Sequence, residues 1–110
     1  IIEGAGGVLV PLNDQDFVID IAVALETPVI LIANLYLGSI NHTLLTVDYL
    51  KRNDIAVKGI IFNGESNLES ERIIEKHSGY KVLLRLPKLG LVNKEVVEYW
   101  ADELMLNWYE

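Results

Sequence analysis

The sequence contains no cysteine and no long uninterrupted run of apolar residues. Without cysteine, the chain has neither disulfides nor thiolate ligands for a metal ion. Each apolar segment is broken by glycine, proline, asparagine or charge before it reaches the roughly 18 residues that a membrane span needs. These absences exclude a disulfide scaffold and a transmembrane helix, so we expect no membrane partner.

Positive charge is scarce as well. Nine lysines and arginines face 16 aspartates and glutamates, which gives a formal net charge of −7. Nucleic-acid-binding surfaces need clustered basic residues, so we expect no nucleic-acid partner. The 110 residues are 51% hydrophobic, with a mean hydropathy of +0.28. This length allows one modest core, and a single unit over residues 1–110 is expected.

Short aliphatic segments alternate with segments that have the apolar spacing of helices. Strands are expected over residues 29–35, 55–62 and 82–86. Helices are expected after Asp16 as a cap, from Ser39, from a capping box at Ser66 and Glu69, and from about Asn93. Continuous aliphatic strands are typical of parallel sheets covered on both faces. The pattern predicts a three-layer α/β/α fold with a mainly parallel sheet.

Three turns follow expected strands and carry glycine or polar residues. They are residues 3–7 after Ile1 and Ile2, residues 38–39, and Asn63 with Gly64. Ligands of α/β proteins bind at the carboxyl ends of parallel strands, so we expect the three turns to converge on one crevice.

Each turn allows two interpretations. Glu3 is either a Mg²⁺ ligand or a solvated charge at a strand end. Ser39 opens either an anion-binding helix N-terminus or an ordinary helix start. The amide of Asn63 either pairs with a base edge or forms an Asx turn with Gly64. His42 has no partner at ligand spacing and is assigned no chemistry.

The chain begins inside an apolar segment without an initiator methionine, which is typical of a fragment. A parallel sheet that lacks strands exposes apolar edges and faces. We therefore expect the isolated chain to associate.

Three segments, in this order and spacing, resemble dethiobiotin synthetases: residues 2–12, 37–46 and 58–63. The resemblance implies a P-loop NTPase-like fold, of which this chain is the C-terminal portion. It further implies a cytoplasmic homodimeric ligase of biotin biosynthesis. Such an enzyme uses ATP, Mg²⁺ and CO₂ to close the ureido ring of 7,8-diaminononanoate, which gives dethiobiotin.

The resemblance also implies roles for individual residues. Glu3 would bind Mg²⁺, and Asn63 would recognise adenine. The residues expected to contact ATP are Glu3, Gly4, Ala5, Gly6, Asn63, Gly64, Pro87, Lys88, Leu89 and Glu95. Those expected to receive the substrate carboxylate, near a dimer interface, are Tyr36, Leu37, Gly38, Ser39, Ile40 and Asn41.

Two departures from the family pattern bear on activity. The 110 residues contain no G-x-x-x-x-G-K-[ST] loop, so we expect no catalytic residue here and no catalysis by this chain alone. Tyr36 stands where several relatives carry lysine, and its hydroxyl supplies no cation at neutral pH.

Two other hypotheses stay open from the sequence. One is another P-loop amidating enzyme, such as a cobyrinate or cobyrate synthetase, or the related region of some phosphate acetyltransferases. These enzymes should lack the run from residue 38 to residue 46. The other is a noncatalytic dimerisation module in which the glycine turns are purely structural.

Overall fold

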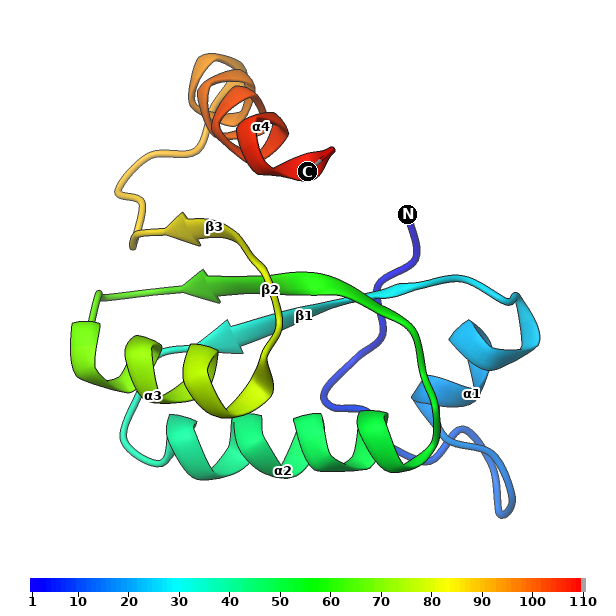
Figure 1. The fold of residues 1–110 in the computed structure, drawn as a ribbon. Helices are drawn as coiled ribbons and strands as arrows, with labels where there is room; N and C mark the ends of the chain where they lie inside the picture. Colours follow the sequence, from blue (N-terminus) through cyan, green and yellow to red (C-terminus); the bar gives the residue numbers. More distant parts are fainter. Residues whose placement is uncertain (110) are drawn as a thin grey trace.

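A central sheet separates the helices into two layers in the computed structural model, which describes residues 1–109 (Figure 1). The strands are β1 (Val29–Asn34), β2 (Val57–Asn63) and β3 (Val82–Leu86), and the helices are α1 (Val18–Ala24), α2 (Ser39–Arg52), α3 (Leu68–Ser78) and α4 (Lys94–Trp108). The strands are parallel, in the order β1-β2-β3. The predicted three-layer α/β/α fold is confirmed.

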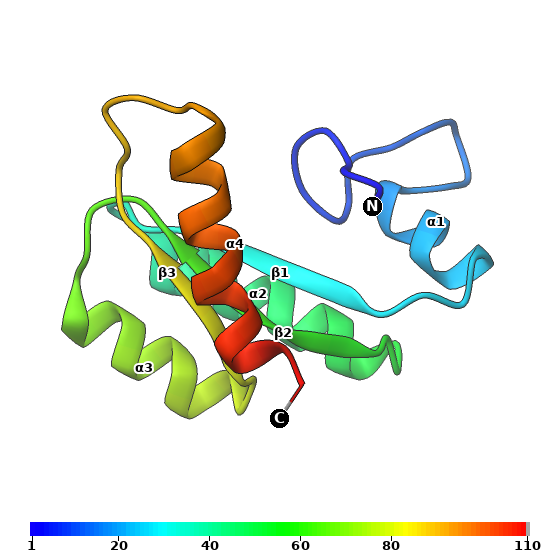
Figure 2. The ribbon, with the colours of Figure 1, turned by 90° about the horizontal axis from the view of Figure 1, so that it is seen from above.

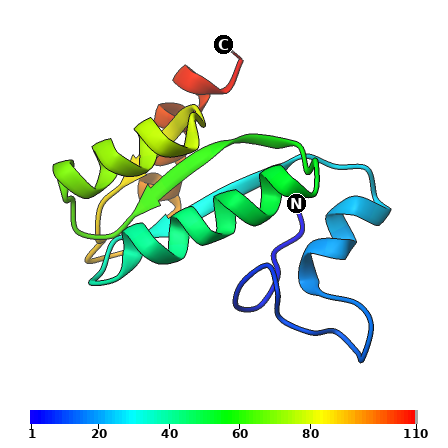
Figure 3. The same ribbon diagram turned by 60° about the horizontal axis from the view of Figure 1, so that its bottom comes forward.

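The helices α2 and α3 cover one face of the sheet side by side, and α4 crosses the other face above β3 (Figures 2 and 3). This arrangement follows from the aliphatic strands, which need cover on both faces. No helix of residues 1–109 is long and apolar enough to cross a membrane.

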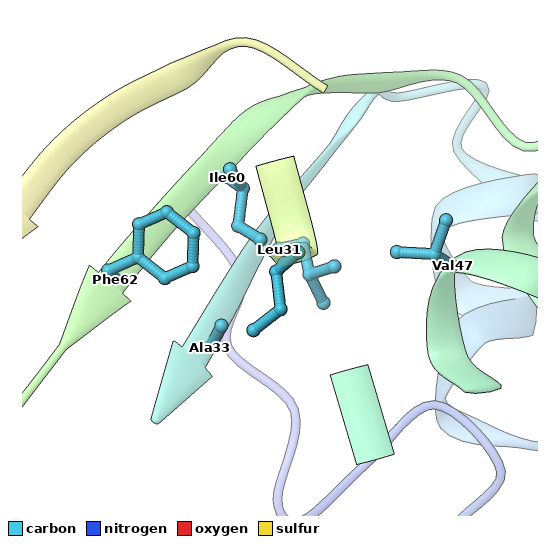
Figure 4. Packing of buried hydrophobic residues seen from close by; sticks show 6 residues of the cluster. Leu31, Ala33, Val47, Ile60 and Phe62 are labelled. Atoms are coloured by element: carbon cyan, nitrogen blue, oxygen red, sulfur yellow. The ribbon is translucent and has the colours of Figure 1, made fainter. Parts of the chain in front are cut away.

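The main core lies between the sheet and the layer formed by α2 and α3. Ile60 and Phe62 on the central strand are fully buried, and they meet Ala33 of β1, Val47 of α2 and Ile74 of α3 (Figure 4). Ile60 and Phe62 share a face because strand side chains alternate with a period of two. The central strand therefore anchors both neighbours.

Two predicted helix starts are wrong by one residue. Phe17, and not Asp16, precedes α1, and its N–H donates to the Asp20 carboxylate at 2.7 Å. Asp16 instead accepts a bond from the Asn13 amide at 2.8 Å, because residues 13–16 form a turn of their own.

The second helix start that was predicted wrongly is the capping box at Ser66 and Glu69. Asn67 is the N-cap of α3, and its side chain accepts from the Ser70 N–H at 3.0 Å. The Ser66 hydroxyl is occupied elsewhere, because it donates to Glu71 at 2.9 Å.

The first residues form no strand, contrary to the expectation for Ile1 and Ile2. Both side chains are exposed, and within residues 1–109 nothing pairs with the outer edge of β1. A strand requires a neighbour that satisfies its backbone hydrogen bonds. The segment instead runs towards α1 (Figure 1).

Gly79 ends α3 with a φ of 67°, the left-handed conformation that glycine commonly adopts at the end of a helix. A Cβ there would meet no atom within 4 Å, so only backbone strain opposes a side chain. We expect Gly79→Ala to lower the free energy of unfolding by about 1 kcal/mol in urea denaturation. The control is Gly90→Ala, which adds a Cβ to equally open space without a left-handed φ and should cost nothing. Equal losses for both variants would contradict this account.

Candidate functional site

The carboxyl ends of the three strands lie at one edge of the sheet. Asn34 pairs in register with Asn63, and Asn63 pairs with Leu86. The loops that follow the strands, residues 35–38, 64–67 and 87–93, therefore leave the sheet at the same level (Figure 1). Loops held in this way by a rigid scaffold are the usual place for binding residues.

An open cavity of about 1030 Å³ lies at this edge. One wall is residues 35–41 with Leu44, Leu45 and Asp48, and the other is Glu65, Ser66, Asn67 and Ser70. All six residues predicted to receive a substrate carboxylate, 36–41, belong to the first wall. The residues of the second wall were not identified from the sequence.

The start of α2 is fixed to the end of β1. Gly38 is the N-cap with a φ of 95°, a left-handed conformation that favours glycine. Ser39 is buried, and its hydroxyl donates to the Asn34 carbonyl at 2.6 Å. The first N–H groups of a helix have no partner within the helix and carry partial positive charge. In α2 the Ser39 N–H donates to the Tyr36 carbonyl at 3.0 Å, and the next N–H groups belong to Ile40 and Asn41, which line the cavity.

Tyr36 is held against the first turns of α2 by His42. The Tyr36 hydroxyl and His42 Nδ1 are 2.5 Å apart, and the ring centroids are separated by 5.6 Å. The sequence analysis assigned no chemistry to His42, and the structure shows that His42 positions the Tyr36 side chain. The tyrosine hydroxyl is thus engaged by the protein, and it brings no charge to the cavity wall.

Asn63 makes its side-chain contact with the neighbouring strand. Its Nδ2 donates to Asn34 Oδ1 at 2.7 Å, so the side chain reaches across to β1 instead of turning back on Gly64. The sequence analysis did not identify Asn34 as a candidate site residue. The signal that could have identified it is a polar residue at the end of an aliphatic strand.

Gly64 connects the end of β2 to the end of β3. Its φ is 111°, and its N–H donates to the Leu86 carbonyl at 2.9 Å. Pro87, Lys88 and Leu89 follow directly, and Glu95 lies in the first turn of α4 after the same loop. The structure thus brings Asn63 and Gly64 beside the segment 87–89.

Residues 3–6 lie apart from this cavity, so within the described residues the three turns do not converge on it. Glu3, Gly4, Ala5 and Gly6 do not line the cavity. Gly4 packs beside α1, where an added Cβ would lie 2.3 Å from Val18 Cγ1. The reason is the missing strand at Ile1 and Ile2, which would have carried this turn into the sheet.

Metal-binding chemistry is limited in residues 1–109. No group of three histidine, cysteine, aspartate or glutamate side chains there could hold a metal ion. Mg²⁺ bound with phosphates often uses only one or two carboxylates and keeps several waters. A single carboxylate can serve in such a site, and the role of Glu3 as a Mg²⁺ ligand stays a prediction.

Comparisons with known proteins agree on one family. The profile of a family described as an AAA domain matches residues 1–96. The ATP-dependent dethiobiotin synthetase BioD of Cytophaga hutchinsonii is 63% identical over all 110 residues, which cover 53% of that protein. The BioD of Afipia carboxidovorans is 45% identical over 97 residues, which are 88% of this chain and 46% of that protein.

A third relative carries a similar segment within a longer protein. The biotin biosynthesis bifunctional protein BioCD of Bordetella avium is 36% identical over 104 residues, 94% of this chain and 22% of that protein. The chain spans about half the length of the dethiobiotin synthetases it matches. The resemblance to dethiobiotin synthetases is confirmed.

The bond from Ser39 to β1 can be tested by removing its hydroxyl. Ser39→Ala leaves the Asn34 carbonyl without this donor, so we expect the free energy of unfolding to fall by about 1 kcal/mol in urea denaturation. Ser70→Ala is the control, because Ser70 also lines the cavity from the first turn of a helix. It should change stability by less than about 0.5 kcal/mol. A Ser39 variant as stable as the control would show that the bond contributes nothing.

Proposed function

Because this chain belongs to the AAA domain family and is similar along its whole length to a dethiobiotin synthetase, we propose that it forms the C-terminal portion of an ATP-dependent dethiobiotin synthetase. This ligase of biotin biosynthesis joins 7,8-diaminononanoate and CO₂ at the expense of ATP, giving dethiobiotin, ADP and phosphate. The observation that best supports the proposal is the shared sheet edge that carries both residues 36–41 and Asn63.

The start of α2 is proposed to hold the substrate carboxylate. The N–H groups of Ile40 and Asn41 lie in the first turn, where the helix dipole favours an anion. The cavity beside them is large enough for an extended aliphatic chain. Recognition would rest on backbone donors, since Tyr36 is neutral and bonded to His42.

The end of β2 is proposed to recognise the adenine of ATP. One N–H of the Asn63 amide is taken by Asn34. The second N–H and the carbonyl oxygen stay available, and this donor and acceptor pair matches the adenine edge. Gly64 and residues 87–89 would border the base, with Glu95 beyond them.

Phosphate and Mg²⁺ chemistry is proposed to depend largely on residues outside this chain. Glu3 would supply one carboxylate to Mg²⁺, and Gly4, Ala5 and Gly6 would approach the phosphates. The 110 residues contain no P-loop motif, which provides the amides and lysine that stabilise phosphoryl transfer. We infer that the chain binds ligands but does not catalyse, and that the complete enzyme is a cytoplasmic homodimer.

Calorimetry separates this proposal from the alternatives. We expect saturable binding of both ATP–Mg²⁺ and 7,8-diaminononanoate to the protein expressed from its complete coding sequence. Binding of nucleotide without the diamino acid would favour another P-loop amidating enzyme. Binding of neither would favour a noncatalytic module.

The adenine contact has its own test. Asn63→Ala removes the amide donor and acceptor together, so we expect the Kd for ATP to rise about tenfold, as for the loss of about 1.4 kcal/mol. The Kd for 7,8-diaminononanoate should not change. Asn53→Ala is the control, because Asn53 lies at the distant C-terminal end of α2. An unchanged Kd for ATP in the Asn63 variant would exclude this assignment.

A further inference from the structure

Glu71 is a buried carboxylate with no assigned role. It lies in α3, and its side chain is 3% exposed. A buried charge is costly unless hydrogen bonds and an opposite charge compensate it. The contacts of the Glu71 carboxylate must therefore compensate the cost of its burial.

The two oxygens of Glu71 bind different parts of the fold. Oε1 accepts from the Ser66 hydroxyl at 2.9 Å and from the Asn67 N–H at 3.2 Å. Oε2 accepts from Arg85 Nε at 2.8 Å. One carboxylate thus joins the loop after β2 to strand β3.

Arg85 carries this connection to the edge of the sheet. It pairs in register with Phe62, one position before the pair of Asn63 with Leu86. Its guanidinium lies 5.8 Å from the centre of the Phe62 ring. Arg85 also contacts Glu75 at 3.4 Å, an exposed partner that does not touch the loop.

We propose that Glu71 is a positioning residue for the nucleotide-base site. Through Ser66 and Asn67 it holds the loop that begins with Gly64, and through Arg85 it holds the strand that ends at Leu86. The bond from the Gly64 N–H to the Leu86 carbonyl lies between these two anchors. The inference rests on the proposed function, since it assumes that Asn63 and residues 87–89 contact the base.

The effect should be selective for one ligand. The other cavity wall, residues 35–41, belongs to the loop after β1 and to the start of α2, and Glu71 makes none of its bonds there. Loss of the Glu71 charge should therefore loosen the base site and the second cavity wall at Ser66 and Asn67. It should leave in place the start of α2, whose N–H groups are proposed to hold the substrate carboxylate. A merely structural role would weaken both sites or neither.

Calorimetry with ATP–Mg²⁺ and with 7,8-diaminononanoate tests the proposal in the protein from the complete coding sequence. We expect Glu71→Gln to raise the Kd for ATP about tenfold and to leave the Kd for the diamino acid within about twofold. Glu75→Gln is the matched control, because it removes the other carboxylate on Arg85 from the same helix. Its Kd values should equal those of the unmodified protein.

Ser66→Ala keeps the test decisive if the Glu71 variant does not fold. It removes one of the two bonds on the loop side and keeps the bond from the Asn67 N–H, so it should raise the Kd for ATP a few-fold. An unchanged Kd for ATP in the folded Glu71 variant would overturn the proposal. If only the Ser66 variant folds, an unchanged Kd for ATP in that variant would overturn it. An equal rise of the Kd values for both ligands would also overturn it. Absence of ATP binding in the unmodified protein would instead overturn the proposed function itself.

Discussion

The in-register pairing of the parallel strands is the constraint on which the site depends. It sets Asn34 opposite Asn63 and Asn63 opposite Leu86, so three loops leave the sheet at one level. A shift of one residue would turn each of these side chains to the other face of the sheet. The bond between the Asn34 and Asn63 amides exists only in the observed register.

The core fixes that register. Ile60 and Phe62 are buried on the central strand against α2 and α3, so a slip of one residue would turn them away from this core. At the edge itself, the bonds of Ser39 and Glu71 attach the helices to the strand ends. These contacts therefore fix the spacing between the loops that follow the strands.

Local patterns predicted the parts of this fold that depend on local chemistry. Strand β3 was predicted at its observed bounds, and the start of the last helix near Asn93 was also correct. The cap of α3 was misplaced because two neighbouring polar residues, Ser66 and Asn67, can each cap a helix. The Ser66 hydroxyl donates to Glu71 in the same helix, and the Asn67 side chain forms the cap. Ile1 and Ile2 failed as a strand because pairing depends on a neighbour that local sequence does not specify.

The site was predictable to a similar extent. Residues 36–41, which line the cavity, were singled out because a strand, a glycine and a helix follow one another directly in the sequence. Asn34 was missed because its importance comes from Asn63, which lies 29 residues away. The contact between Glu71 and Arg85 joins a helix to a strand and has no sequence signature. Long-range pairs of this kind require the fold to be known.

The most direct measurement is an amide NMR titration of the protein from its complete coding sequence. Addition of ATP–Mg²⁺ should shift the side-chain resonances of Asn63 and the backbone resonances of Gly64 and residues 88–89. Addition of 7,8-diaminononanoate should shift those of residues 38–41. Saturating ligands that leave the resonances of this sheet edge unchanged would contradict the account.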